Sequence, residues 1–192
     1  LVTQGLYQVK APLPAVPGVE GVGVVTETGE DSKFRVGDKV VGFCHGGGTL
    51  ADYFEVTNNS AWHAPTRVPD PTLAALSVTY GTSYFGLVHR ANLRPGETLL
   101  ILGAAGGVGL AAIQLGKMLG AKVIAAAGSQ EKIDVCARQG ADYTINYNTQ
   151  DLVDEVKRLT DGEGANVIYD PVGGDIFEQT KRCIAWDGRI II

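Results

Sequence analysis

The sequence has few cysteines and no long apolar run. Its three cysteines stand far apart at positions 44, 136 and 183, and no CxxC pair occurs. This pattern argues against a disulfide framework and a structural zinc site, and it is typical of a reducing compartment. Because no run approaches the roughly 18 apolar residues that a membrane span needs, a transmembrane protein is not expected.

Positive charge is also scarce. The chain has 16 Lys and Arg residues against 21 Asp and Glu residues, a formal net charge of −5. Proteins that bind nucleic acid usually have a basic face with interleaved aromatic residues, and the sequence shows no such strip. We therefore expect no nucleic-acid or membrane partner and a cytoplasmic location. A targeting segment would not be visible, because the sequence starts at Leu1 rather than at a Met.

Glycine is abundant, with 26 residues, and the first part of the chain uses it between short β-like segments. We expect strands at 20–28, 38–43 and 49–56, where apolar and β-branched residues are bounded by glycine and proline. Close spacing of such strands is typical of a small antiparallel barrel or meander. Residues 1–75 are therefore predicted to be mostly β.

From residue 76 onward the pattern changes to strands that alternate with helices. Helices at 72–76 and 80–91 are expected to form the junction. We then expect strands at 98–102, 122–126, 142–145, 166–169 and from about 188, and helices at 108–119, 130–139, 151–159 and 175–184. This alternation predicts an α/β domain over 76–192, a doubly wound parallel sheet with helices on both faces.

The segment ILGAAGGVGLAAIQLGK, residues 101–117, joins the first of these strands to its helix through a glycine turn. Dinucleotide sites carry G-x-G-x-x-G at this place, and here an alanine takes the first glycine position. Ala105, Gly106, Gly107, Val108 and Gly109 are therefore candidate pyrophosphate ligands at a helix N-terminus. The alternative is a tight turn that holds no ligand.

The end of the second strand bears on which dinucleotide is bound. NAD sites usually place a carboxylate there for the ribose 2′-hydroxyl, but the segment around Gly128 and Ser129 has none. Lys132, a turn further on, offers a positive charge. We therefore expect NADP(H) rather than NAD(H). The alternative is that Ser129 only caps a helix and that Lys132 is only solvated.

Seven stretches together resemble a known family. They are QGLYQVKAPLP (4–14), PGVEGVGVV (17–25), VGDKVVG (36–42), YGTSY (80–84), PGETLLILGAAGGVGLAAIQLGKMLGAKVIA (95–125), INY (145–147) and YDPVGGDIF (169–177). In content and order they resemble the zinc-independent quinone oxidoreductases, the zeta-crystallin type, of the medium-chain dehydrogenase/reductase superfamily. The resemblance covers nearly the whole chain.

This resemblance implies part of a GroES-like catalytic domain followed by an incomplete Rossmann domain, with NADPH in the cleft between them. It implies hydride transfer from NADPH to a quinone or another electron-poor enone. It places the 2′-phosphate among Gly128, Ser129, Lys132 and Tyr147. Tyr147 is alternatively an aromatic plug at a strand end. Asp170 and Val172, which follow the fourth strand, are implied contacts of the cofactor ribose.

The resemblance also bears on catalysis. Val19 stands where metal-dependent relatives have a zinc-ligand histidine, and Cys44 is alone where they have a cysteine-rich lobe, so no metal is expected. Tyr7 and Thr82 match family residues near the nicotinamide. Tyr7 is either a proton donor to the acceptor oxygen or a stacking wall.

Two other activities fit the same fold. One is reduction of another activated double bond, such as an acryloyl thioester, and the other is NADPH binding without catalysis. Against the family pattern, about 50 residues at the start and over ~100 at the end are missing from this chain. We therefore expect weakened cofactor binding and poor turnover from these 192 residues alone. Full-length family members are expected to be homodimers or homotetramers.

Overall fold

A computed structural model describes residues 2–7 and 12–192, so part of the 4–14 stretch quoted above lies outside the described residues. The chain divides into two compact units, Leu1–Val78 and Thr79–Ile192. This division falls a few residues after the boundary that the sequence predicts, which is after residue 75. The two units are described separately below.

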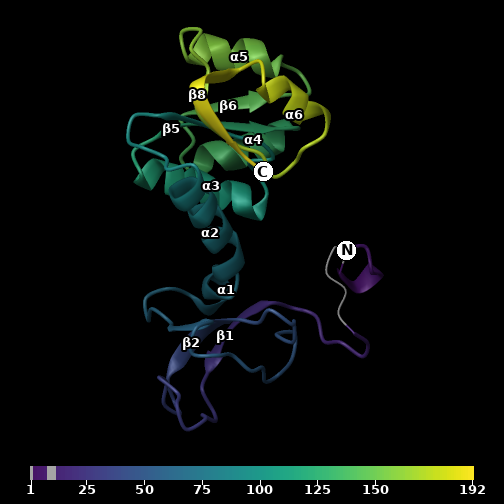
Figure 1. The fold of residues 1–192 in the computed structure, drawn as a ribbon, viewed down its shortest axis with the longest axis vertical. Helices are drawn as coiled ribbons and strands as arrows, with labels where there is room; N and C mark the ends of the chain where they lie inside the picture. The colour runs from purple at the N-terminus through teal and green to yellow at the C-terminus, as the bar shows by residue number, and fades with distance from the viewer. Residues whose placement is uncertain (1, 8–11) are drawn as a thin grey trace. The chain divides into compact units, whose positions relative to one another are not determined.

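The first unit is built on a three-stranded antiparallel meander, in the order β1-β2-β3. A short 3₁₀ turn (η1, Val2–Gln4) comes first, and the strands are β1 (Glu20–Val24), β2 (Lys39–Phe43) and β3 (Ala61–His63) (Figure 1). A one-turn helix, α1 (Asp70–Leu73), buries Leu73 in a cluster with Val41 of β2. Pro71 occupies the first turn of α1, where a missing N–H has no consequence.

The prediction of a strand at 49–56 is wrong. This segment has no regular secondary structure, and the strand that pairs with β2 on the side away from β1 is the shorter β3. Side chains of the segment instead cover glycines of the sheet. A Cβ on Gly21 would lie 2.9 Å from the Phe54 ring, and one on Gly42 would lie 2.5 Å from Val56 Cγ1. The alternating apolar residues therefore pack onto the face of the meander rather than extending its ladder.

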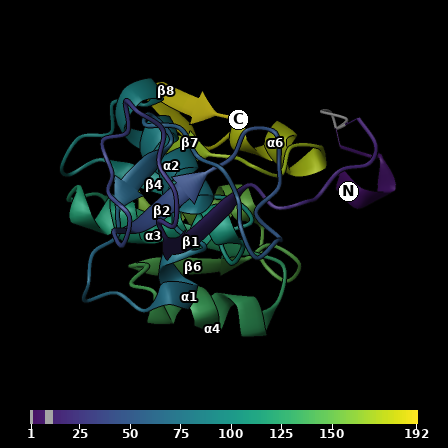
Figure 2. The ribbon, with the colours of Figure 1, turned by 90° about the horizontal axis from the view of Figure 1, so that it is seen from below.

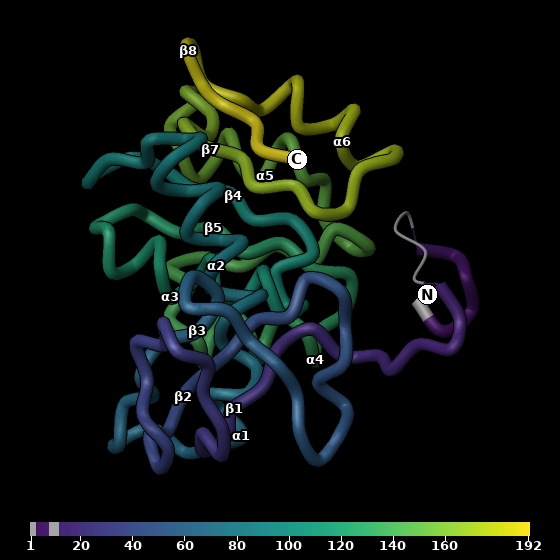
Figure 3. The backbone as a smooth tube through the Cα atoms, turned by 60° about the horizontal axis from the view of Figure 1, so that its bottom comes forward, coloured from purple at the N-terminus to yellow at the C-terminus, as the bar shows by residue number. Residues whose placement is uncertain are grey.

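The second unit is a five-stranded parallel sheet in the order β6-β5-β4-β7-β8. Its strands are β4 (Thr98–Ile101), β5 (Lys122–Ala127), β6 (Tyr143–Asn146), β7 (Ala165–Tyr169) and β8 (Ile184–Ile191). Its helices are α2 (Ser77–Tyr84), whose first two residues belong to the first unit, a π-helical continuation η2 (Phe85–Arg90), α3 (Gly107–Met118), α4 (Gln130–Arg138), α5 (Leu152–Leu159) and α6 (Asp175–Thr180). The tube view shows β8, β7, β4 and β5 in succession (Figure 3). The order is that of a Rossmann sheet, which confirms the predicted fold class.

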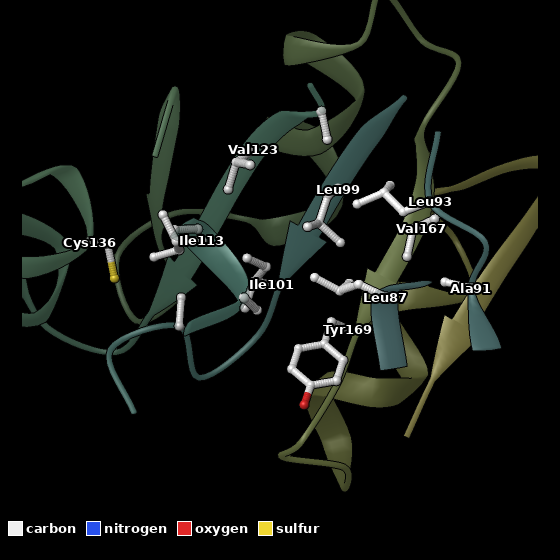
Figure 4. Packing of buried hydrophobic residues seen from close by; sticks show 14 residues of the cluster. Leu87, Ala91, Leu93, Leu99, Ile101, Ile113, Val123, Cys136, Val167 and Tyr169 are labelled. Carbon is white, nitrogen blue, oxygen red and sulfur yellow. The ribbon is translucent and has the colours of Figure 1, made fainter. Parts of the chain in front are cut away.

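Both faces of this sheet are covered, as the near-continuous apolar strands predict. Along β4, Leu99 and Ile101 belong to one buried cluster with Leu87 of η2 and Ile113 of α3 (Figure 4). Their neighbour Leu100 belongs to the opposite cluster, which contains residues of α5. Successive side chains of a strand point to opposite faces, so one short strand anchors both layers. The carboxyl ends of the strands therefore belong to a sheet that is packed on both faces.

The end of the chain differs in detail from the prediction. Helix α6 ends at Thr180 rather than at 184, and β8 begins at Ile184 rather than near Gly188. The early start follows from pairing of Ala165 with Ile184, after which the β7–β8 register shifts before Val167. The carboxyl end of the chain lies at the tip of β8 (Figure 2). None of the helices in the described part of the chain has the length and apolarity of a membrane span.

Arg189 of β8 links its strand to the segment between η2 and β4. Its guanidinium donates to both carboxylate oxygens of Glu97 at 2.8 Å, to the Ala91 carbonyl at 2.8 Å and to the Asn92 carbonyl at 3.2 Å. The hydrogen bond from Arg189 lowers the pKa of Glu97 below its ordinary value of 4.5. A carboxylate stabilised in this way contributes to folding only while it is ionised.

We expect this pair to make the fold acid-sensitive. The stabilisation is fully present above the unfolded-state pKa and is lost as the pH falls through the lowered folded-state pKa of Glu97. Glu97→Gln should reduce the free energy of unfolding by about 1–3 kcal/mol at neutral pH, because a charged hydrogen bond is lost. The free energy of unfolding of this variant should also decline less steeply than that of the wild type as the pH falls toward about 3. Urea unfolding across this pH range tests both effects, with the exposed Glu27→Gln as a control that should leave the decline unchanged.

Candidate functional site

The glycine turn after β4 has the geometry of an anion site. Gly103 has a positive φ of 56°, and its carbonyl accepts a hydrogen bond from Gly106 N–H at 3.0 Å. Helix α3 begins directly afterwards at Gly107. Its N-cap residue, Gly106, makes no side-chain cap hydrogen bond. The first N–H groups of α3 and the positive end of its dipole are therefore not masked by a capping side chain.

The glycines of the turn have different roles. A Cβ on Gly109 would lie 2.6 Å from the Ala104 carbonyl oxygen and 2.7 Å from two further backbone atoms of Ala104, so only glycine lets α3 start this close to the turn. A Cβ on Gly106 would meet only the Gly103 carbonyl oxygen, at 3.4 Å. Gly106 therefore presents an open backbone surface, while Gly109 is required by packing.

A cavity of about 250 Å³ opens beside this turn, at the carboxyl ends of β4 and β5. It is lined by Gly103, Ala105, Gly106, Ala127, Gly128, Lys132 and Tyr147. Residues from three separate sequence motifs thus meet at one place. Two of them, Gly103 and Ala127, are additions to the predicted set, and a signal for both existed in the sequence. Gly103 stands between the first apolar strand and the turn, and Ala127 ends the acid-free second strand.

The far wall of the cavity combines a helix start with one positive charge. Ser129 is the N-cap of α4, and its side chain accepts a hydrogen bond from the Lys132 N–H at 3.4 Å. Lys132 is exposed, and its ammonium group is the positive charge at the cavity. The described residues that line the cavity include no carboxylate. The capping reading of Ser129 is therefore correct, and it leaves the Lys132 side chain available to an anion.

Tyr147 lies just after β6 and closes the same end. It is half-buried, packs against the cluster of buried residues on the α5 face of the sheet, and also lines the cavity. A Cβ on Gly128 would stand 3.1 Å from its ring and 3.2 Å from its hydroxyl oxygen. The aromatic ring is thus both a plug at a strand end and a wall of the cavity.

Asp170 and Val172 follow β7. The Asp170 side chain is fully buried, and its Oδ1 accepts hydrogen bonds from the N–H groups of Val172 and Gly173 at 2.9 Å each. Its Oδ2 has no hydrogen-bond partner among the described residues. Val172 is 52% exposed, and its Cγ2 lies 2.8 Å from the place of a Cβ on Gly103. Asp170 therefore shapes the turn that holds Val172 beside the glycine turn, and the ribose contact stays a prediction.

The remaining predicted residues do not line the cavity. Gly107, Val108 and Gly109 form the first turn of α3, Thr82 is exposed on α2, and Tyr7 is 44% exposed in the first unit. The catalytic roles of Tyr7 and Thr82 stay predictions. Ser83, next to Thr82, is a further residue that the sequence did not single out. It is buried and donates to the Val108 carbonyl at 2.8 Å, which ties α2 to the first turn of α3.

Cys44 is a free, partly buried cysteine of the first unit. Its Sγ donates to the Glu55 carbonyl at 2.7 Å, and burial, together with the charge of Glu55, raises the pKa of the thiol. A raised pKa disfavours the thiolate that binds metals. In the described parts of the chain, no three His, Cys, Asp or Glu side chains are grouped closely enough to hold an ion. The expectation of metal-free chemistry rests on Val19 and on this thiol.

Two family models match the chain. One is described as the alcohol dehydrogenase GroES-like domain and matches residues 1–66. The other is described as a zinc-binding dehydrogenase and matches residues 107–192. Together they cover most of both units. The GroES-like match lies in the amino-terminal part of the chain, where the family resemblance implied it.

Individual proteins agree with this. The chain is 46% identical, over 97% of its length, to a quinone oxidoreductase-like protein 2 homolog of Nematostella vectensis, of which it covers 52%. The Escherichia coli quinone oxidoreductase solved with NADPH is 32% identical, with a TM-score of 0.89 over 98% of this chain and 58% of that one. The CurK enoyl reductase is 29% identical, with a TM-score of 0.87 over 97% of this chain and 57% of that one.

The chain spans about half the length of the curated relatives it matches, between 52% and 55% for the quinone oxidoreductase-like proteins. Within that span the likeness is continuous, from the GroES-like part through the glycine turn to β8. Sequence, strand order and the two family models agree. The chain therefore belongs to the medium-chain dehydrogenase/reductase superfamily, in its zinc-independent, quinone oxidoreductase-like branch.

Proposed function

We propose that the protein is an NADPH-dependent oxidoreductase that reduces a quinone or another electron-poor enone without a metal. The observation that carries the proposal is the cavity at the glycine turn, which joins two helix N-termini and Lys132 and lacks a carboxylate. Such a surface suits a dinucleotide with a phosphate on its adenosine ribose. The likeness to an Escherichia coli enzyme solved with NADPH supports this choice.

In the proposed complex the pyrophosphate lies on the backbone of Ala105, Gly106 and Gly107, against the first N–H groups of α3, to which Val108 and Gly109 belong. The 2′-phosphate lies at the start of α4, where Lys132 supplies the charge and Ser129 and Gly128 supply backbone surface. Tyr147 forms the wall beside the adenosine. Val172 contacts the ribose on the nicotinamide side from its turn, which Asp170 holds in place.

The bound cofactor would supply a hydride to the acceptor. A quinone or enone that accepts a hydride develops negative charge on its carbonyl oxygen, and this oxygen must then be protonated. We propose that Tyr7 stands near this oxygen, as a proton donor or as a wall that orients the acceptor, and that Thr82 contacts the nicotinamide. Positioning of the two reactants then supplies most of the acceleration.

A second candidate function is reduction of an activated double bond in a thioester. The likeness to an enoyl reductase favours it, because such an enzyme uses the same fold. In both reactions a hydride adds to a carbon conjugated with a carbonyl group, so the cavity for the cofactor does not distinguish them. A non-catalytic NADPH-binding protein is the third candidate. In each case we propose a homodimer or homotetramer for the whole protein, as full-length relatives are expected to form.

An acceptor panel on the whole protein tests these candidates. NADPH oxidation is followed by its fluorescence with quinones, simple enones and acryloyl thioesters at equal concentration, and we expect the quinones to react fastest. Faster oxidation with the thioesters would favour the second candidate. Binding of NADPH without oxidation by any acceptor would favour the third, and binding of neither NADPH nor NADH would contradict the proposal.

A further inference from the structure

Asn148 does not line the cavity but holds a residue that does. Its side-chain Nδ2 donates to the Gly128 carbonyl oxygen at 2.6 Å. Its own backbone N–H donates to the Asn146 side chain at 3.2 Å, which fixes the start of the turn after β6. Asn148 is exposed and lies outside the motifs that suggested a cofactor. The hydrogen bond crosses from the end of β6 to the end of β5.

Gly128 is enclosed on the same side by two side chains. A Cβ there would stand 3.1 Å from Tyr147 Cε2 and 3.3 Å from Asn148 Nδ2. Distances in this range require the neighbouring side chains to move. Gly128 does not have a positive φ, so its backbone conformation is one that residues other than glycine adopt readily. A larger residue at position 128 is disfavoured only by the side chains of Tyr147 and Asn148. Tyr147 and Asn148 thus fill the space that a side chain at position 128 would take.

The hydrogen bond also orients the next peptide group. In a trans peptide the C=O and the N–H point in opposite directions. Because Asn148 holds the Gly128 carbonyl, the Ser129 N–H points away from Asn148. Ser129 begins α4, and Lys132 lies in the first turn of that helix. One surface amide therefore sets the orientation of the backbone that leads into the positively charged wall of the cavity.

We propose that Asn148 is a positioning residue for the 2′-phosphate of the cofactor, and that it acts through the Gly128 carbonyl rather than by touching the ligand. This inference rests on the proposed function, since it presupposes that the 2′-phosphate lies at the start of α4. It adds a residue that determines cofactor preference. Removal of the amide lets the Gly128–Ser129 peptide rotate and weakens the fit of the phosphate, while the rest of the dinucleotide site is unchanged.

The test measures the dissociation constants of two ligand pairs that differ in the 2′-phosphate, NADPH against NADH and 2′,5′-ADP against 5′-AMP. For Asn148→Ala we expect binding of the phosphorylated member of each pair to weaken by about three- to tenfold, the value of one hydrogen bond. Binding of the unphosphorylated member should change by less than about twofold. Asn148→Asp has nearly the same shape as the wild type. It should weaken binding of the phosphorylated member more than Asn148→Ala does, because a carboxylate cannot donate to Gly128 and repels the phosphate.

Thr149→Ala is the matched control, because this exposed neighbour bonds the Asn146 carbonyl and not Gly128. Thr149→Ala should leave the dissociation constants of both ligand pairs unchanged. Gly128→Ala should also weaken binding of the phosphorylated ligands. Combined with Asn148→Ala it should show less than the product of the two effects, because both disturb the same contact. Equal weakening of both members of a pair, independent effects of the two substitutions, or no effect of Asn148→Ala would each overturn the proposal.

The wild-type protein separates this inference from the proposed function. If it binds NADH and 5′-AMP as tightly as their phosphorylated partners, the proposed NADPH preference fails and the role of Asn148 fails with it. If it prefers the phosphorylated ligands and Asn148→Ala keeps that preference, the proposed function stands and only the positioning role is wrong.

Discussion

Lys132→Glu is expected to weaken NADPH binding by about 10- to 100-fold while NADH binding changes little or improves. Lys132 supplies the charge of the cavity wall, and a charged hydrogen bond to a phosphate contributes about 1.5–3 kcal/mol. The substitution also places a carboxylate near the ribose, which repels the 2′-phosphate and can accept a hydrogen bond from a 2′-hydroxyl. Fluorescence titration with both cofactors measures the change.

The control for this experiment reverses a charge on the same helix. Arg138 is exposed in the last turn of α4, away from the helix start that borders the cavity. Arg138→Glu changes the net charge of the protein by the same amount and should leave the ratio of the NADPH and NADH dissociation constants unchanged. If both variants alter the ratio equally, the preference reflects net charge. If neither does, Lys132 does not bind the 2′-phosphate.

Gly109→Ala should destabilise the fold by about 3 kcal/mol and abolish measurable NADPH binding. The added Cβ would overlap backbone atoms of Ala104 at 2.6–2.7 Å, and backbone on both sides cannot move as a flexible side chain can. The start of α3 must therefore shift away from the turn, which displaces the N–H groups that we propose bind the pyrophosphate. For a chain of this size the melting temperature should fall by about 6–12 °C.

Gly81→Ala is the matched control for the glycine substitution. Gly81 lies within α2 and has nothing within 4 Å of an added Cβ, so alanine should stabilise the helix by about 0.5–1 kcal/mol. Thermal unfolding and NADPH titration of both variants separate packing from helix propensity. A Gly109→Ala protein with the wild-type melting temperature would show that the close contact at Ala104 is relieved without cost.

The sequence alone predicted the alternation of strands and helices in the parallel half of the fold, although the bounds of α6 and β8 differ. Short apolar strands such as β4 alternate with helices, and strands buried on both faces need no partner information to be recognised. The glycine turn was readable for the same local reason, because a strand, a turn and a helix follow one another within residues 98–118. Local patterns predict local structure, and the proposed pyrophosphate site lies within this one segment.

The meander was harder to predict. Residues 49–56 alternate like a strand, yet Phe54 and Val56 cover Gly21 and Gly42, and the ladder uses β3 instead. An alternating pattern reports that one side is buried but not whether the backbone pairs with a neighbour. Hydrogen-bonded pairing depends on which segments meet, and this is a property of the whole unit.

The proposed site for the 2′-phosphate was likewise predictable only in part. The residue types at 128, 129, 132 and 147, and with them the expected preference for NADPH, were visible in the sequence and in its family resemblance. That Ala127, Lys132 and Tyr147 border one cavity depends on β5 lying between β4 and β6. The contact of Asn148 with Gly128 spans 20 residues and exists only because the carboxyl ends of two parallel strands lie side by side. Chain order sets which chemical groups are present, and strand order sets which of them meet.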